Sequence, residues 1–258
     1  MKALTLPAGR GWHWLSGGFR LFRKGRLVLS LAVLGYWLCM ALINSFPIVG
    51  QIAASLLVPA FSVGLMNVCR LIEQGGTLQA RELFSGLRQN QRTLLVLGAI
   101  YIVAGVCVLG FVSLIDGGVL FQAIVLGDRL DERTLSSGEF VLAVQVALLL
   151  FSPIMMTYLF APVLAVWHGF PAGKSLFFSF FACARNWRAF VAYAVAVILY
   201  GALLPGLLVG LLVSVIPGGS ELFSVLLPML IMLIFLPTLY ASFYVSYRDI
   251  FVSIDENA

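Results

Sequence analysis

The chain has 258 residues, of which 61% are hydrophobic and 10% charged, and its formal net charge is +5. Water-soluble domains contain about 45–50% apolar and about 25% charged residues, and polar groups cover their surface. The composition therefore excludes an ordinary soluble domain and indicates that a lipid bilayer surrounds most of the chain. No separate basic module suggests nucleic-acid binding. The four cysteines include no CxxC pair and predict no disulfide framework.

The first predicted element, residues 11–24, is an amphipathic helix at the membrane interface. Its apolar face carries Trp12, Leu15, Phe19 and Phe22. Cations occupy the other side, and aromatic rings opposite cations are typical of a helix at headgroup level. Gly17 and Gly18 are expected to weaken this helix. The next apolar stretch is too long for the hydrophobic region of a signal peptide, so we predict that Leu27 opens a retained span.

Six charge-free apolar segments follow, each long enough to cross about 30 Å of hydrocarbon at 1.5 Å per residue. The predicted spans are residues 27–46, 51–69, 93–115, 140–167, 189–216 and 222–247. Apolar runs of this length predict transmembrane helices. We therefore predict an all-α polytopic membrane helix bundle that forms a single integral membrane domain over residues 1–258.

Two further interfacial helices, at residues 79–90 and 173–185, precede the third and fifth spans. Together with the first they make three basic elbows, in which a Phe stands four residues before one Arg and a second Arg follows. The three sets are Phe19, Arg23 and Arg26; Phe84, Arg88 and Arg92; and Phe181, Arg185 and Arg188. We interpret the recurrence either as a threefold repeat of elbow, span and span or as a general pattern of membrane proteins.

Prolines stand inside several predicted spans, where each removes a backbone hydrogen bond and clashes with the preceding turn. The residues predicted to kink their helices are Pro59, Pro153, Pro162, Pro205 and Pro237. The segment 140–167 contains two of them and is longer than a perpendicular crossing requires, so a tilted and kinked helix is expected there.

The distribution of cations predicts the orientation in the membrane. Of the 16 Lys and Arg residues, 14 lie at the termini and in the two elbow connections, while the other two lie in the polar connection 116–139. The positive-inside rule therefore places both termini in the cytoplasm. The elbow arginines are candidate contacts for anionic headgroups of the cytoplasmic leaflet: Arg23, Arg26, Arg88, Arg92, Arg185 and Arg188. The alternative is that these cations only fix the topology.

No Asp, Glu, Lys or Arg lies inside a predicted span, which argues against a carrier driven by protons or voltage. The sequence contains no catalytic triad, HExxH, phosphate-binding loop or dinucleotide fingerprint. The two histidines cannot supply the three or four converging ligands of a metal site. We therefore predict no catalytic residues, no metal, no cofactor and no enzyme activity.

Three stretches carry a resemblance to a known family: PAGRGWHWLSGGFRLFRK, WHGFPAGKSLFFSFFACARNWRAF and LYASFYVSYRDIF. With the six-span layout, they resemble a proteobacterial family of inner-membrane proteins described only as transmembrane proteins. The chain is also distantly similar to the membrane domain attached to some glycerophosphodiester phosphodiesterases, although no catalytic domain of that kind is fused to it. The resemblance implies a bacterial inner-membrane location and supplies no catalytic or binding residues.

These observations favour a non-catalytic accessory or scaffold protein that contacts lipids or other membrane proteins. A passive carrier or conduit for an apolar or amphipathic molecule is the alternative, and a lipid-modifying enzyme is the third hypothesis. The carrier would use the kinked fourth and sixth spans, residues 140–167 and 222–247. A continuous polar or lipid-filled cavity between those two helices favours transport, whereas a tightly packed interior favours the scaffold.

Overall fold

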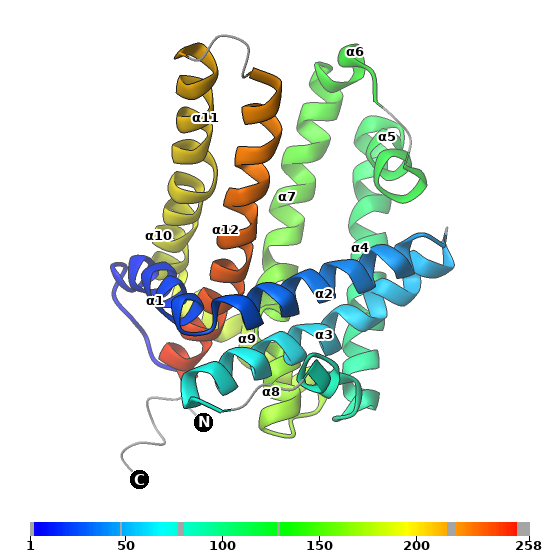
Figure 1. Cartoon of the computed structure of the whole chain (residues 1–258). Coiled ribbons are helices and arrows are strands. Elements are labelled where there is room, and N and C mark those ends of the chain that lie inside the picture. The colour runs from blue at the N-terminus through cyan, green and yellow to red at the C-terminus, as the bar shows by residue number, and fades with distance from the viewer. Residues whose placement is uncertain (1–2, 47, 77–79, 128–129, 216–219, 252–258) are drawn as a thin grey trace. The chain divides into compact units, whose positions relative to one another are not determined.

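The computed structural model describes residues 3–46, 48–76, 80–127, 130–215 and 220–251, and this part of the chain is helical without a β-strand (Figure 1). The helices in chain order are α1 (Arg10–Lys24), α2 (Arg26–Asn44), α3 (Val49–Gln74), η1 (Ala80–Leu87), α4 (Gln91–Asp116), α5 (Val119–Phe121), η2 (Gln122–Leu126), α6 (Glu132–Leu135), α7 (Gly138–Tyr158), α8 (Ala161–Trp167), α9 (Ala172–Arg185), α10 (Trp187–Ile198), η3 (Leu199–Leu203), α11 (Leu204–Val215) and α12 (Ser220–Phe251). The predicted all-α fold class is confirmed.

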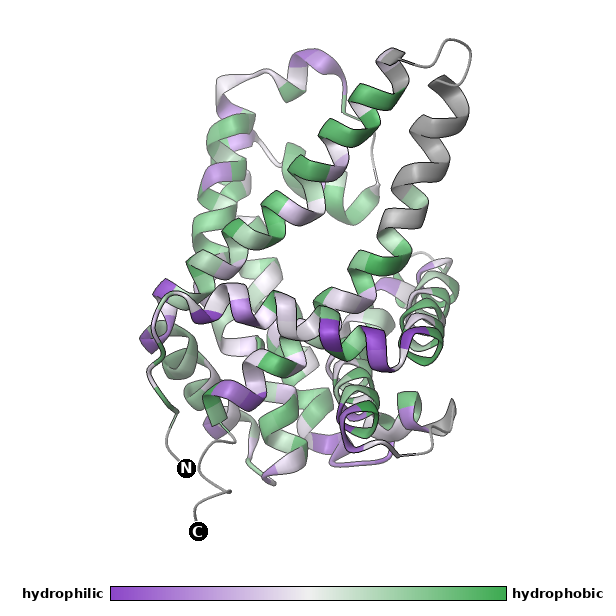
Figure 2. Ribbon diagram, turned by 60° about the vertical axis from the view of Figure 1, so that its left-hand side comes forward, coloured by the Kyte–Doolittle hydropathy of each residue, from purple (hydrophilic) through white to green (hydrophobic). Residues whose placement is uncertain are grey.

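Five helical segments within the described residues are long and apolar enough to cross a membrane. They are Arg26–Asn44, Val49–Gln74, Gln91–Asp116, Gly138–Trp167 and Trp187–Leu212. The predicted sixth span, residues 222–247, lies within the 32-residue helix α12, which at 1.5 Å per residue is about 48 Å long. Residues 79 and 216, which bound two predicted elements, lie outside the described residues. The long helices are mainly hydrophobic along their length, and hydrophilic residues concentrate near helix ends and connections (Figure 2).

The apolar surface of these helices is largely uncovered by protein. In the most apolar part of Trp187–Leu212 only 6% of the residues are buried, and in that of Gly138–Trp167 only 17%. Large side chains such as Leu149 and Leu211 are exposed. Exposed apolar surface of this extent is typical of contact with hydrocarbon, so the prediction of a polytopic membrane bundle is confirmed in this respect.

The chain forms two compact units, each assembled from segments that are distant in sequence. Unit 1 contains residues 1–38, 63–85 and 182–258, and unit 2 contains residues 39–62 and 86–181. In unit 1, α1 packs against α10 and α12, and α11 lies beside α12 (Figure 1). In unit 2, α4 packs against α7 around Val108, Val112, Ala143 and Ala147.

Helix α1 packs against other helices of the protein through its glycines. A Cβ atom on Gly11 would lie 2.2 Å from the carbonyl oxygen of Ala189, and one on Gly18 would lie 2.5 Å from the backbone nitrogen of Ser242. Glycine at these two positions therefore permits backbones to approach closely, a role that the expected weakening of the helix did not include. The predicted apolar face is divided accordingly. Leu15 and Phe22 are buried, while Trp12 and Phe19 are exposed.

The second and third elbow helices differ from each other in structure. The second is the short 3-10 helix η1, whose Leu83 is buried and whose Phe84 is exposed. The third is α9, which buries small and polar side chains: Ser175, Ser179, Ala182 and Cys183. Its exposed side carries Phe177 and Phe181, with ring centroids 4.5 Å apart. A helix that exposes aromatic rings and buries hydroxyls has the pattern expected at a membrane interface.

Ser179 bridges the break between α7 and α8 in unit 2. Its Oγ accepts a hydrogen bond from the Phe160 backbone nitrogen at 3.0 Å and donates one to the Met156 carbonyl at 2.8 Å. Pro162 stands in the first turn of α8, where it cannot donate a backbone hydrogen bond. The hydroxyl thus satisfies backbone groups that the interrupted helix leaves without helical partners.

Candidate functional site

Four cations surround one shallow cavity in unit 1, where α1 ends and α2 begins. The cavity has a volume of about 310 Å³ and is lined by Arg20, Arg23, Lys24 and Arg26. Among the described residues, none of the four forms an ion pair with a carboxylate. Their mutual repulsion is therefore not compensated within this part of the protein, and an anion bound among them would relieve it. We call these four residues the cation pocket.

The local sequence explains how the cation pocket forms. Helix α1 ends at Lys24, and the Gly25 backbone nitrogen donates to the Phe22 carbonyl oxygen before α2 starts at Arg26. Arg23 and Lys24 lie in the last turn of α1, where the unpaired carbonyls form the negative end of the helix dipole and favour cations.

A second cavity of about 240 Å³ shares Arg20 and Lys24 with the cation pocket and also includes Glu73 and Arg248. Glu73 already has two partners of its own. It pairs with Arg248 and accepts a hydrogen bond of 2.7 Å from the Tyr244 hydroxyl. The single carboxylate at this cavity is thus neutralised by Arg248 and leaves the charge of the cation pocket in place.

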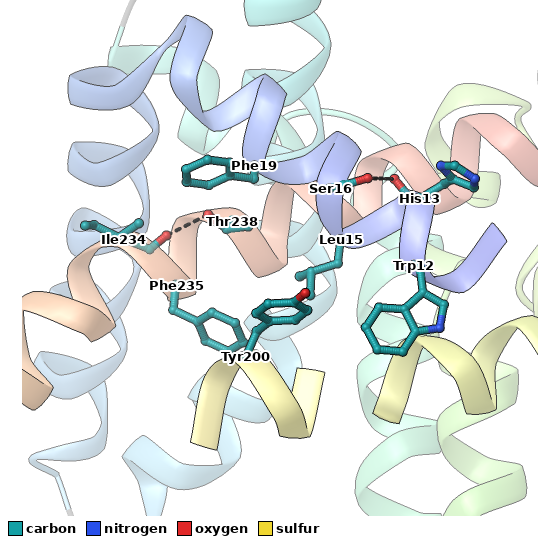
Figure 3. A pocket seen from close by; sticks show the side chains of 9 residues that line it. All are labelled: Trp12, His13, Leu15, Ser16, Phe19, Tyr200, Ile234, Phe235 and Thr238. Carbon is teal, nitrogen blue, oxygen red and sulfur yellow. Dashed lines mark hydrogen bonds between the residues drawn. The ribbon is translucent and has the colours of Figure 1, made fainter. Parts of the chain in front are cut away.

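A larger apolar cavity of about 660 Å³ lies between α1, η3 and α12 (Figure 3). Its lining residues are Trp12, His13, Leu15, Ser16, Phe19, Tyr200, Ile234, Phe235 and Thr238. Trp12, Phe19, Tyr200 and Ile234 form an exposed rim, whereas Leu15 and Thr238 are buried. The rings of Trp12 and Tyr200 meet edge to face with centroids 6.1 Å apart. The volume falls within the roughly 300–1,000 Å³ that is usual for small-molecule sites. We call this cavity the apolar pocket.

Helix α1 connects the two pockets along one of its faces. Residues three or four positions apart on a helix are neighbours on its surface. Trp12, Ser16 and Phe19 line the apolar pocket, and the next residue of this series, Arg23, lines the cation pocket. The two cavities are therefore consecutive features of a single helical face. Arg23 lies on the same face as Trp12 and Phe19, and not on the opposite side as the sequence predicted.

Contacts at both ends of the chain hold α1 in position on α12. Asp249 accepts hydrogen bonds from Nε of Arg10 and from Nε1 of Trp14, each at 2.8 Å, and it forms an ion pair with Arg10. Burial alone raises the pKa of Asp249, but these hydrogen bonds and the nearby positive charges outweigh it and lower the pKa below its ordinary value. Asp249 is therefore ionised at neutral pH and anchors the N-terminal part of α1.

All six arginines predicted as lipid contacts are exposed, but the structure brings only two of them into one cavity. Arg23 and Arg26 share the cation pocket. Arg88 follows η1, and Arg92 lies in the first turn of α4. The guanidinium of Arg185 donates to the Thr5 hydroxyl at 3.0 and 3.2 Å. The guanidinium of Arg188 lies 5.5 Å from the ring centroid of its neighbour Trp187.

The sequence prediction missed Arg20 and Lys24 as members of the cation pocket. Both belong to the basic run that ends at Arg26, so the signal was present in the sequence. The prediction selected only the arginines that fit the recurring Phe–Arg–Arg spacing. The apolar pocket was also missed, because α1 forms it together with Tyr200 and with residues 234–238, which lie about 190 and about 220 positions further along the chain.

The five predicted kink prolines occupy different helical contexts. Pro59 and Pro153 lie inside the uninterrupted helices α3 and α7, and Pro237 lies inside α12. Pro162 stands in the first turn of α8 after the break, and Pro205 is the second residue of α11, directly after the π-helix η3.

A comparison with known proteins identifies a relative over nearly the whole chain. A protein of Burkholderia thailandensis, named a probable inner membrane protein, is 34% identical over 258 residues, which cover 97% of this chain and 94% of the relative. No protein-family model matches the sequence, and no solved structure matches it. Identity of this degree over this length shows common ancestry. Together with the apolar helices described above, it establishes that the chain belongs to this family of multi-pass inner-membrane proteins.

Proposed function

We propose that the protein is a non-catalytic accessory protein of the inner membrane that binds the headgroups of anionic lipids in the cytoplasmic leaflet. The observation that carries this proposal is the cation pocket, where four cations converge without a carboxylate partner among the described residues. Guanidinium groups bind phosphate oxygens through paired hydrogen bonds, which makes a phospholipid headgroup a suitable ligand.

The other elbows support a common role. In all three, the Phe that precedes the first Arg is exposed: Phe19, Phe84 and Phe181. An exposed ring one helical turn from an exposed guanidinium suits the boundary between acyl chains and headgroups. The predicted orientation places these groups in the cytoplasmic leaflet, whose anionic lipids attract basic residues at about 1 kcal/mol per cation.

Lipid retention by purified variants tests the proposal. Phosphatidylglycerol that co-purifies with the protein is quantified for the wild type and for the Arg23→Gln plus Arg26→Gln variant. Two cations contribute about 2 kcal/mol, so the variant is expected to bind this lipid roughly 30-fold more weakly. The control Arg133→Gln removes a cation from the connection 116–139, outside the three elbows, and is expected to retain the lipid. Equal retention by both variants and the wild type contradicts the proposal.

The apolar pocket supports a second candidate, a passive carrier for an apolar or amphipathic molecule. Its rim is exposed and its inner residues are buried, so an apolar molecule could enter it from the membrane and leave again. Reconstitution in vesicles with a fluorescent phospholipid in one leaflet distinguishes the two functions. Transfer of the lipid to the other leaflet at a rate proportional to protein favours the carrier, and an unchanged rate favours the accessory protein.

A further inference from the structure

We infer that the apolar pocket and the cation pocket together form one site for a single anionic phospholipid, with an acyl chain in the former and the phosphate in the latter. This inference rests on the proposed function and goes further, because it assigns the ligand's chain as well as its headgroup.

The two pockets have the complementary chemical characters of the two ends of an anionic lipid. Six of the nine residues that line the apolar pocket are aromatic or aliphatic, with Trp12, Phe19 and Tyr200 at its rim and Leu15 buried. Such a surface attracts a hydrocarbon chain but does not select a charged group. The cation pocket has the opposite character. A ligand that satisfies both must carry an anionic group at one end of an apolar chain.

The two pockets follow one another along α1. Phe19 lines the apolar pocket, and Arg23, one helical turn further, lines the cation pocket. A ligand lying along α1 therefore passes from one pocket into the other.

The length of α1 between the two pockets is similar to the length of an acyl chain. Trp12 and Arg23 are eleven residues apart, which corresponds to about 16 Å along the helix axis. An acyl chain that spans half of the roughly 30 Å hydrocarbon thickness is about 15 Å long, so such a chain covers a similar distance when it bends into the membrane plane and lies along the interfacial helix α1. The face of α1 between the far end of the apolar pocket and the cations thus accommodates a membrane-length chain.

The accessible rim shows how a chain can enter. Tyr200 is 52% exposed and Ile234 is 49% exposed, and both stand beside apolar helices that face hydrocarbon. Ser16 is exposed and lines the same pocket, and its hydroxyl donates a hydrogen bond of 3.2 Å to the His13 carbonyl of its own helix (Figure 3). A larger side chain at residue 16 would fill the pocket and leave the cation pocket intact.

Native mass spectrometry with synthetic lipids tests the inference. The probes are dioleoyl-phosphatidylglycerol, dihexanoyl-phosphatidylglycerol with the same headgroup and short chains, and dioleoyl-phosphatidylcholine. The wild type is expected to bind dioleoyl-phosphatidylglycerol at least tenfold more tightly than either other probe. Ser16→Phe is expected to remove the preference for the long chain while binding of the short-chain lipid stays unchanged. Arg23→Gln plus Arg26→Gln is expected to weaken binding of both phosphatidylglycerols by a similar factor.

The matched control is Ser152→Phe, which places the same ring at an exposed serine of α7 whose hydroxyl also bonds three residues back, to Leu149. It is expected to bind all three lipids like the wild type. If Ser16→Phe fails to fold, Ile234→Trp fills the rim from α12 instead.

The outcomes separate the inference from the proposed function. If the pocket-filling variants keep full affinity for the long-chain lipid while the arginine variant loses it, the chain does not occupy the apolar pocket, and only the inference fails. If the arginine variant keeps full affinity, the proposed function fails. If a pocket-filling variant loses a dimer or a co-purified membrane protein but binds lipid normally, the pocket belongs to a protein partner and the inference is overturned.

Discussion

Arg10 and Asp249, which are 239 positions apart in the chain, form a two-pronged ion pair that joins the start of α1 to the end of α12. Nε of Arg10 donates to one carboxylate oxygen of Asp249, and a terminal guanidinium nitrogen donates to the other. The Trp14 indole adds a third hydrogen bond to the same carboxylate. Because α1 supplies residues to both pockets, this contact positions the entire candidate site.

Replacement of Asp249 by Asn tests this anchor. Hydrogen bonds to charged groups contribute about 1.5–3 kcal/mol to stability. The free energy of unfolding of the variant is therefore expected to be lower by about that amount at pH 7. The pKa of Asp249 is lowered in the folded protein, so its stabilising effect is present above the ordinary Asp value of about 4 and is lost as pH falls through the lowered value. Thermal unfolding in detergent from pH 7 to pH 2 measures both effects.

The control for this prediction is Asp131→Asn. Asp131 caps the short helix α6 by accepting from the Thr134 backbone nitrogen, and Asn caps helices equally well. This variant is expected to match the wild type at pH 7. The anchoring role is contradicted if Asp249→Asn unfolds at the wild-type temperature at every pH.

Gly18 is predicted to be intolerant of a methyl group. An Ala side chain there would lie 2.5 Å from the Ser242 backbone nitrogen and 2.6 Å from its Cα, so backbone must shift. Overpacking of this kind costs about 1–3 kcal/mol. Gly173→Ala in α9 meets nothing within 4 Å and is expected to be neutral or to stabilise by up to about 1 kcal/mol. Thermal unfolding of the two variants compares them, and equal stability would falsify the close approach of α1 to α12.

Ser179 is predicted to stabilise the break between α7 and α8. Ser179→Ala leaves the buried Phe160 backbone nitrogen without its acceptor, which costs about 1–3 kcal/mol. Ser152→Ala removes an exposed hydroxyl from α7 and is expected to change stability by less than about 0.5 kcal/mol. Chemical denaturation of both variants provides the comparison. A neutral Ser179→Ala shows that the interruption does not depend on this hydroxyl.

Accessibility of single cysteines tests the predicted orientation. In a variant whose four native cysteines are replaced, Ser136→Cys near α6 is expected to react with a membrane-impermeant maleimide from the periplasmic side. Gln74→Cys at the end of α3 is expected to react only after the inner membrane is opened. The reverse pattern places the termini in the periplasm and removes the cation pocket from the cytoplasmic leaflet.

Local patterns in the sequence predicted the helical architecture well. Charge-free runs such as 93–115 gave helices such as α4, because the length and hydrophobicity of a span are properties of one segment. The exposed Phe181 of α9 also followed from spacing along one helix. Features that depend on one segment alone can therefore be predicted from the sequence.

Contacts between distant segments were not accessible. From the sequence, Gly18 is only a helix-weakening residue, because its close contact with Ser242 depends on a distant segment. The contact between Tyr200 and Trp12 likewise cannot be predicted from either segment alone. The sequence indicated the basic run at the end of α1. It did not indicate that four of its cations surround one cavity, since that depends on the turn at Gly25.

The most direct test of the central claim is the headgroup preference of the wild-type protein. Native mass spectrometry with an equimolar mixture of dioleoyl-phosphatidylglycerol and dioleoyl-phosphatidylcholine measures it with chain length held constant. The cation pocket predicts at least tenfold preferential binding of phosphatidylglycerol, and this preference is expected to weaken as salt screens the charges. Equal binding of the two lipids at low salt contradicts the account.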